Sequence, residues 1–410
     1  MHKSRVVNNT IMLYLMSIAK LIFPLLTLPY LTRVLTEEAY GLVSYVKSCM
    51  TYLQLIVDFG FLLSSVKDIV NANGDNKKIG EIVGNTIGAK LMLVVVSTLV
   101  MGVMVVTIPI LRINISYFIL SFITVATTVF LADFFFRGIE KMHYITMIYV
   151  STKAVSTILT FVFVKNDGNI LWIPILDILA NLLSIGITWV IIHQLQIIIH
   201  ISSFRVCWRM IKESFIYFAS SVATTAFSAL NTMLIGIYLT DLKQVAYWGL
   251  CLNIIASIQG LYAPVCNSVY PHMIREKNLK FIHKVLAIFM PIVTVGCIFS
   301  FFFSKTAMLI VGGEKYVPAY TLFRWMIPIL FFSFPAQLYG WPTLGGIGKT
   351  KQTTLSTIAA AIAQVVGLVV LAVTNYFTLT ALAILRWSTE ALMMCIRIYF
   401  TYQNRDSFKR

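Results

Sequence analysis

Six basic residues lie inside long apolar stretches of this sequence, and they are the residues best placed to do chemistry. A charge at membrane depth costs at least about 2.5–3.5 kcal/mol, so such a residue usually faces protein or water and marks the path of a ligand. A surface on which positive charges gather favours an anionic ligand. We therefore expect an anion-binding surface formed by Lys20, Lys47, Lys90, Lys153, Arg324 and Arg386.

Polar residues accompany these cations at steps of three or four residues, which places them on one face of a helix. One set surrounds Lys47 and another surrounds Lys153. Glu390 follows Arg386 by four residues and can pair with it on the same helix face. The expected polar lining consists of Thr51, Gln54, Asp58, Tyr149, Ser156, Asp177 and Glu390.

A structural role is the alternative for each of these cations. A lysine can extend its amine toward the membrane surface, and nearby carbonyl groups can hold it there. The Arg386–Glu390 pair can likewise serve packing alone. The sequence leaves both interpretations open.

Catalytic and metal-binding patterns are missing from the sequence. The six histidines sit in connections or at the ends of apolar stretches, and the six cysteines show no CxxC spacing. The segment Gly346–Thr350 resembles a phosphate-binding loop, but position 343 is Thr where that loop requires Gly. We therefore expect no enzyme, no metal and no cofactor.

The composition indicates that membrane-spanning helices position these residues. The chain of 410 residues is 59% hydrophobic and 12% charged, about half the charged fraction of a soluble domain. Twelve apolar stretches are long enough to span a membrane as helices, so the predicted fold class is an all-α integral membrane protein. They cover roughly 9–32, 39–66, 80–108, 113–136, 143–164, 170–196, 208–239, 245–270, 284–303, 317–340, 353–374 and 378–401.

The distribution of Lys and Arg predicts the orientation. Of the 32 such residues, twenty, Arg397 among them, fall in the two terminal segments and the even-numbered connections or at the span ends next to them, and six fall in the odd-numbered connections. Positive residues gather on the cytoplasmic side, so both termini are expected there. The same bias accounts for the net charge of +16 without nucleic acid as a partner.

A weak internal repeat divides the predicted helices into two halves. Tyr30–Thr32 precedes Ala39-Tyr40-Gly41, and about 208 residues later Tyr238–Thr240 precedes Ala246-Tyr247-Trp248-Gly249. Coincidence is the alternative, but an offset of half the chain is typical of transporters built from parallel repeats. We expect an N-terminal lobe at 1–200 with helices 1–6 and a C-terminal lobe at 201–410 with helices 7–12.

Several segments resemble one family of membrane proteins. The run Phe23–Leu35, followed by Ala39–Ser44 and Leu55–Phe61, is similar to the opening of Wzx-type polysaccharide flippases, which belong to the multidrug/oligosaccharidyl-lipid/polysaccharide exporter superfamily. Asp133–Met142 extends the similarity, and Gly313–Ala319 and Gly348–Lys351 continue it more loosely. The resemblance implies two six-helix lobes around a central cavity.

The resemblance also implies a function. Members move undecaprenyl-pyrophosphate-linked oligosaccharide repeats from the inner to the outer leaflet of the bacterial plasma membrane, for O-antigen or capsule synthesis, by alternating access. The cations named above would receive the pyrophosphate and any acidic sugars. Membrane lipids, a polysaccharide polymerase and a chain-length regulator are the further expected partners. Coupling to H⁺ or Na⁺ is compatible with this mechanism but not required by it.

Two other functions compete with this one. A cation-coupled multidrug exporter of the same superfamily would favour an acidic cavity, whereas the residues within the predicted spans are mostly basic. A membrane-embedded glycan ligase or polymerase would usually carry a large periplasmic loop, and no odd-numbered connection here is long.

The charge bias yields a direct test of topology. We predict that reporters fused after Lys78, Arg209 and Lys280 report the cytoplasm, and that reporters at Glu38, Asp167 and Asp241 report the periplasm. Paired alkaline phosphatase and green fluorescent protein fusions measure this. Two or more reversed reporters would contradict the predicted number of spans.

Overall fold

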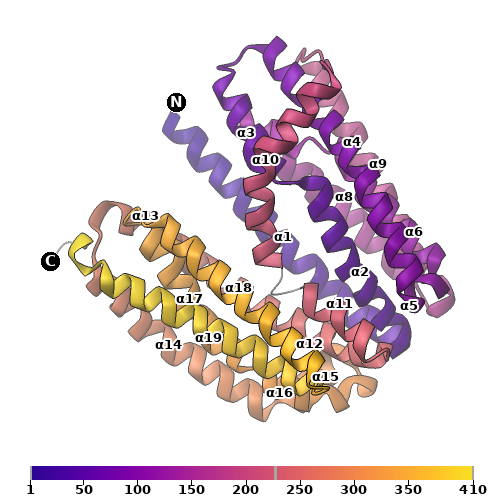
Figure 1. Cartoon of the computed structure of the whole chain (residues 1–410), viewed down its shortest axis with the longest axis vertical. Coiled ribbons are helices and arrows are strands. Elements are labelled where there is room, and N and C mark those ends of the chain that lie inside the picture. The colour runs from indigo at the N-terminus through magenta and orange to yellow at the C-terminus, as the bar shows by residue number, and fades with distance from the viewer. Residues whose placement is uncertain (1, 226–228, 409–410) are drawn as a thin grey trace. The chain divides into compact units, whose positions relative to one another are not determined.

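The computed structural model describes residues 2–225 and 229–408, and every regular element in that part of the chain is a helix (Figure 1). Ten of these helices are long and apolar enough to cross a membrane. An eleventh crossing is formed if Glu314–Met326 and Pro328–Gly345, which meet at a bend of 44°, are one span. The chain is therefore a multi-pass membrane protein, which confirms the predicted fold class.

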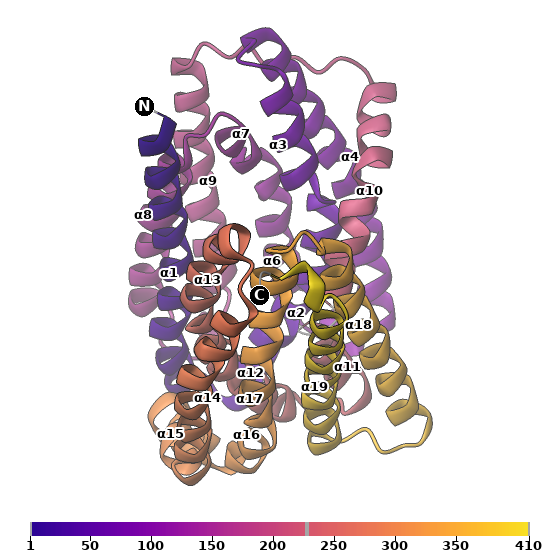
Figure 2. The same ribbon diagram turned by 90° about the vertical axis from the view of Figure 1, so that its left-hand side faces the viewer.

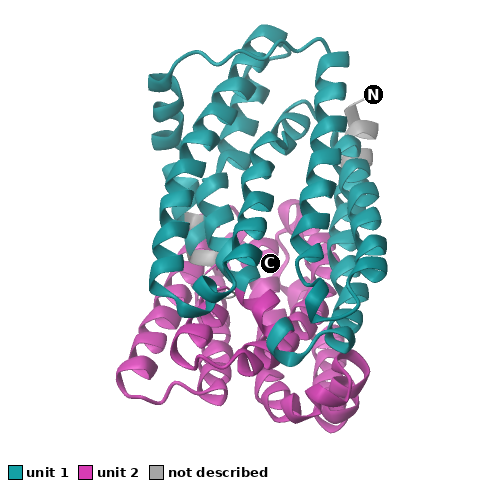
Figure 3. Cartoon of the chain, turned by 90° about the vertical axis from the view of Figure 1, so that its right-hand side faces the viewer, with its two compact units in different colours: residues 1–39, 46–222 teal, residues 40–45, 223–410 magenta. Residues whose placement is uncertain are grey.

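The first compact unit, unit 1, comprises residues 1–39 and 46–222, shown in teal in Figure 3. Within it α1 packs along α8, and α8 packs along α9 (Figure 2). The helices of this unit are α1 (His2–Val34), α2 (Glu37–Asp58), α3 (Phe61–Asn71), α4 (Asn76–Thr107), α5 (Pro109–Ile113), α6 (Ile115–Thr127), α7 (Asp133–Gly138), α8 (Met142–Phe163), α9 (Trp172–Gln194) and α10 (Phe204–Thr225).

The second compact unit, unit 2, comprises residues 40–45 and 223–410. Here α19 packs along both α17 and α18, and α17 also packs against α14 (Figure 1). Its helices are α11 (Ala229–Tyr238), α12 (Leu242–Gly260), α13 (Tyr262–Glu276), α14 (Leu279–Phe302), α15 (Ser304–Gly312), α16 (Tyr320–Met326), α17 (Pro328–Leu338), the π-helix η4 (Tyr339–Gly345), α18 (Thr350–Val373) and α19 (Leu379–Gln403).

Most predicted spans coincide with the observed helices. The predicted seventh span, 208–239, includes residues 226–228, which lie outside the described residues, with α10 before them and α11 after them. The total of twelve spans therefore stays a prediction. The same holds for the lobe boundary between residues 200 and 201, because the compact units divide after residue 222 and unit 2 also takes residues 40–45 from α2.

Side-chain caps explain where several helices begin. Thr36 accepts a hydrogen bond from the Ala39 N–H at the start of α2, and Thr378 accepts one from the Ala381 N–H at the start of α19. At the start of α4, Asp75 accepts hydrogen bonds from the Lys77 and Lys78 N–H groups. The bond from Lys78 contributes most to holding the pKa of the Asp75 carboxyl below its ordinary value. Such caps satisfy N–H groups that have no partner inside the helix.

The glycines of the internal repeat lie at the crossing of α2 and α12. A side chain on Gly41 would collide with the backbone carbonyl of Leu242, and a Cβ on Gly249 would lie 2.8 Å from Ser44 Oγ. Each repeat thus contributes a small residue at the point where the other repeat's helix approaches. Small residues let helix backbones come close together in membranes, so this part of the repeat serves packing.

Motif residues that carry the family resemblance also hold the fold together. Tyr30 donates hydrogen bonds from its hydroxyl to the carbonyls of Phe161 and Val164, at 2.9 and 2.8 Å, at the end of α8. Tyr316 is fully buried and contacts the rings of Tyr40 and Tyr247. Phe134–Phe136 are buried as well.

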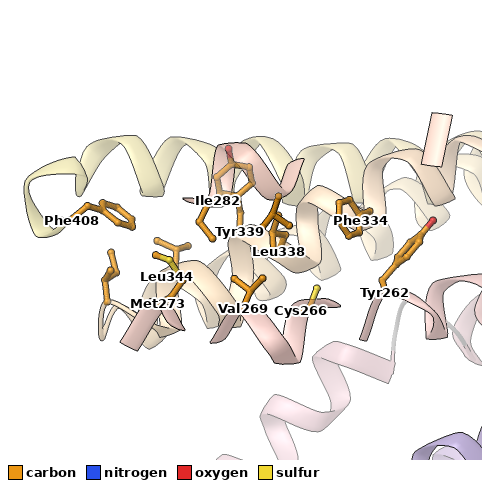
Figure 4. Packing of buried hydrophobic residues seen from close by; sticks show 12 residues of the cluster. Tyr262, Cys266, Val269, Met273, Ile282, Phe334, Leu338, Tyr339, Leu344 and Phe408 are labelled. Atoms are coloured by element: carbon orange, nitrogen blue, oxygen red, sulfur yellow. The ribbon is translucent and has the colours of Figure 1, made fainter. Parts of the chain in front are cut away.

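Unit 2 has its own apolar core along the length of α13. Tyr262, Cys266, Val269 and Met273 line one face of that helix and pack against Phe334, Leu338 and Tyr339 (Figure 4). The same cluster includes Leu344 of η4 and Phe408 of the C-terminal segment. The core therefore joins the broken end of α17 to the end of the chain.

Candidate functional site

Lys153 forms an ion pair inside unit 1. Its Nζ lies 2.8 Å from Asp177 Oδ1, and Ser156 Oγ donates to the same oxygen at 3.3 Å. The pair joins α8 to α9, and both side chains are about one third exposed. The sequence analysis placed Lys153 in the anion-binding surface and Ser156 and Asp177 in its polar lining, and the structure brings the three together.

Lys90 forms a second ion pair in unit 1. Its Nζ lies 2.9 Å from Asp58 Oδ1, and Asp58 Oδ2 accepts from Gln54 Nε2 at 2.8 Å. Gln54 also donates to Thr128 Oγ1 at 3.0 Å, so the network joins α2 and α4 to the segment that follows α6. The Lys90 side chain is 7% exposed, so its charge is largely neutralised by Asp58 rather than offered to a ligand.

Lys20 and Lys47 differ from these two lysines. Both side chains are exposed, and within the described part of the chain no salt bridge joins either of them to a carboxylate. The amine of Lys20 lies 5.4 Å from the centre of the Tyr149 ring. Lys47 interacts electrostatically with Lys153 and Asp177 without pairing with Asp177. These two amines are free to meet an anion.

Asp133 lies near the Lys90–Asp58 pair and near Lys20, and it was not among the predicted site residues. Its side chain is exposed at the start of α7, and it interacts electrostatically with Lys20, Lys90 and Arg137. Its position within an apolar run was the available signal in the sequence. We call the resulting set the unit 1 polar cluster: Lys20, Lys47, Gln54, Asp58, Lys90, Asp133, Tyr149, Lys153, Ser156 and Asp177.

The unit 1 polar cluster holds four lysines and three aspartates, so it carries a small positive excess. The ion-paired lysines contribute little to that excess, and Lys20 and Lys47 contribute most of it. Thr51, also predicted as lining, is exposed but donates its hydroxyl hydrogen to the Lys47 carbonyl at 2.9 Å. The arrangement can bind an anion by charge, and it contains no nucleophile beside a base.

Arg324 lies in unit 2, and its guanidinium contacts other groups of the protein. Its Nε donates to the Phe301 carbonyl at 3.1 Å and to Ser304 Oγ at 2.8 Å. Its guanidinium also stacks near the rings of Phe301 and Tyr320, at 4.7 and 4.9 Å. These contacts tie α16 to α14 and α15, so they account for Arg324 without a ligand.

Arg386 and Glu390 form the predicted pair on α19. Arg386 Nη2 lies 2.9 Å from Glu390 Oε1, and both side chains are buried. The second carboxylate oxygen, Glu390 Oε2, is buried and accepts no hydrogen bond from the described residues. Next to the pair in sequence, Thr389 donates to Gln364 Oε1 at 2.7 Å, and Gln364 donates to Asn231 Oδ1 at 3.0 Å.

Arg397 is a buried cation that the sequence analysis counted as cytoplasmic. It is 7% exposed on α19 and donates to the Ala336 carbonyl, Ser356 Oγ and Thr357 Oγ1, at 2.6, 2.9 and 2.9 Å. Its position near the end of an apolar stretch gave no signal, because an arginine there usually reaches the membrane surface.

A pocket of about 520 Å³ in unit 1 lies apart from all of these residues. Its lining includes Asp68, Lys78, Glu81, Arg209 and Glu213, from α3, α4 and α10. None of the predicted site residues lines it. No group of three or more potential metal ligands occurs among the described residues.

A family model described as "Polysaccharide biosynthesis protein" matches residues 6–277 of this sequence. The chain belongs to this family. Two proteins that carry the name "Putative O-antigen transporter" are similar to it. The one from Escherichia coli (strain K12) is 24% identical and covers 97% of each chain, and the one from Shigella dysenteriae is 27% identical and covers 71% of this chain and 75% of the relative. The expected resemblance to Wzx-type flippases is confirmed.

Two solved structures are similar to this chain in fold. An inward-facing transporter of the multidrug resistance MATE family, in the MOP superfamily, superposes with a TM-score of 0.68 at 12% identity, covering 94% of this chain and 98% of that chain. The lipid II flippase MurJ in an inward closed conformation superposes with a TM-score of 0.70 at 11% identity. The match covers 97% of this chain and 87% of that chain. At these identities the likeness concerns the fold. The relatives from Escherichia coli and Shigella dysenteriae are named as transporters, in agreement with the expectation that the chain is not an enzyme.

Proposed function

We propose that this protein moves undecaprenyl-pyrophosphate-linked oligosaccharide repeats from the cytoplasmic to the periplasmic leaflet of the bacterial inner membrane, for O-antigen or capsule synthesis. The observation that carries the proposal is the pair of exposed lysines, Lys20 and Lys47, that no salt bridge joins to a carboxylate in the described part of the chain. In a family of polysaccharide biosynthesis proteins, the anion that two such amines would receive is the pyrophosphate of the lipid-linked glycan.

Physical reasoning supports transport of such an anion. A pyrophosphate does not cross hydrocarbon unaided, because a charged group loses its hydration there. The membrane potential, with the cytoplasm negative, favours outward movement by about 2.3 kcal/mol per charge per 100 mV. We propose that the lobes alternate around the bound headgroup while the lipid tail stays in the bilayer. We propose that both termini lie in the cytoplasm, as the charge bias of the sequence predicts.

The charge balance also weighs against the main competing function. A drug exporter for organic cations needs carboxylates that are free to pair with its substrate. In the unit 1 polar cluster Asp58 and Asp177 are already held by Lys90 and Lys153. Asp133 interacts with three cations and with one other carboxylate, that of Asp58. The lysines outnumber the aspartates, so we prefer an anionic substrate.

We assign anion binding to Lys20 and Lys47 and a structural ion pair to Lys153, and export measurements can distinguish these two roles. In a strain that lacks its own flippase, Lys20→Ala and Lys47→Ala should each lower surface polysaccharide by about tenfold. A hydrogen bond to a charged group contributes about 1.5–3 kcal/mol, and about 1.4 kcal/mol is a factor of ten. Lys→Arg at either position should keep partial export, and the double Ala variant should export least. Surface glycan is measured at matched amounts of membrane protein.

Lys305→Ala provides the matched control, because Lys305 is also exposed and also lies over a tyrosine ring, 4.8 Å from that of Tyr320 in unit 2. It should export normally. Lys153→Ala should lower the amount of protein in the membrane, since it leaves Asp177 without its ion pair. Adding Asp177→Ala should restore that amount. Normal export by both Lys20→Ala and Lys47→Ala would contradict the proposal.

We further propose that transport is coupled to H⁺ or Na⁺ and that Glu390 takes the ion. An ionised carboxylate oxygen without a partner is costly inside a membrane protein. Glu390 Oε2 is such an oxygen within the described chain, and a proton or a small cation would satisfy it. Arg386 holds only the other oxygen.

Glu390→Gln should therefore remove the dependence of transport on an imposed gradient of H⁺ or Na⁺, because an amide imitates the protonated acid and binds cations poorly. The measurement is the rate of lipid-linked glycan movement in proteoliposomes with and without each gradient. Glu276→Gln, at an exposed residue at the end of α13, is the control and should respond like the wild type. Equal stimulation of Glu390→Gln and wild type by a gradient would reject Glu390 as the coupling residue.

A further inference from the structure

The helix α17 does not continue regularly to its end. It passes into the π-helix η4, in which Gly340 has non-helical backbone angles of φ −69° and ψ −116°. Pro342 has no N–H, so the Leu338 carbonyl loses the partner it would have in an α-helix. Thr343 Oγ1 replaces that partner at 2.8 Å. A π-helical turn in a membrane helix often marks a functional site.

Arg397 binds the chain next to this break. Its Nη1 donates to the carbonyl of Ala336, four residues before Gly340. A Cβ on Gly340 would lie 2.7 Å from the same Nη1, so the guanidinium passes where only glycine leaves room. The other donors, Nε and Nη2, reach Ser356 and Thr357 on α18. One side chain thus joins α17, α18 and α19 at the break.

The partners of Arg397 suit a contact that can be released. All three hydrogen-bond acceptors are neutral oxygens. The carboxylate of Glu390 attracts the guanidinium electrostatically without accepting a hydrogen bond from it. Each bond to a neutral group is modest, and together they hold one arrangement of a segment that could adopt another. Beyond η4, which ends at Gly345, the chain continues through Gly346 and Gly348, and Gly348 has a φ of 83°. Glycine gives the backbone of this segment access to conformations that other residues avoid.

We infer that Gly340 is a hinge and that Arg397 is the latch that holds it in the state described here. In this arrangement the segment 340–349 can swing when Arg397 lets go of the Ala336 carbonyl and of α18. Leu344 would then leave the apolar core around Met273 and Leu338 (Figure 4). The charge bias places this end of the span at the cytoplasm, so the motion would open or close that side.

Hydrogen–deuterium exchange of the purified full-length protein in lipid nanodiscs tests the latch without any substrate. Arg397→Gln should raise amide exchange in residues 336–349 at least tenfold. Arg324→Gln is the matched control, because Arg324 also donates to a carbonyl and a serine in unit 2 but away from η4. It should leave exchange in 336–349 unchanged. If Arg397→Gln does not fold, the milder double variant Ser356→Ala/Thr357→Val should raise the same exchange by a smaller factor.

A transport measurement then separates a latch from an arginine with a purely structural role. This second experiment rests on the proposed function. In proteoliposomes the Ser356→Ala/Thr357→Val variant should change the maximal rate of glycan movement and leave the half-saturating concentration unchanged. Variants of Lys20 or Lys47 should change the half-saturating concentration. Unchanged exchange in 336–349 in both latch variants would overturn the inference, whether or not the protein transports glycans. Faster exchange with a wild-type maximal rate would also overturn it.

Discussion

The cost of placing a charge in hydrocarbon constrains this structure more than any other interaction. Each cation inside the membrane-spanning part must find a carboxylate, a set of polar oxygens or water, because an uncompensated charge there costs several kcal/mol. Lys90 and Lys153 pair with carboxylates, and Arg324 and Arg397 donate hydrogen bonds to carbonyls and hydroxyls. Lys20 and Lys47 remain exposed. They are the places where a ligand rather than the protein itself can supply the compensating charge.

Much of the fold could be predicted from hydropathy alone, because length and apolar content decide which helices can cross a membrane. Eleven of the twelve predicted spans coincide with long apolar helices or with the bent pair around Ile327. Hydropathy could not predict where helices break inside an apolar run. The segments around Gly60, Leu131 and Gly340 read as continuous apolar runs, yet α2, α6 and α17 end near them. Local backbone geometry there depends on tertiary partners such as Tyr217, next to Gly60, and Arg397.

The site was harder to predict because charge neutralisation depends on residues far apart in the sequence. Helical spacing correctly placed Gln54 and Asp58 on one face, and Tyr149 with Lys153 on another. It gave no information on which amine meets which carboxylate: Asp58 pairs with Lys90, 32 residues away, and Asp177 pairs with Lys153, 24 residues away. The resemblance motifs gave little help, because Tyr30, Gly41 and Tyr316 turn out to hold helices together.

Recognition of the pyrophosphate by Lys20 and Lys47 is tested most directly by comparing two lipid-linked glycans that share one sugar repeat, one carrying the pyrophosphate and one carrying a neutral linker. We would measure their rates of movement across proteoliposomes containing the purified protein. We predict that the wild type moves the pyrophosphate form at least tenfold faster and that the Lys20→Ala/Lys47→Ala variant loses this preference. A double variant that keeps the full preference would contradict the assignment of these two lysines as the anion-binding residues.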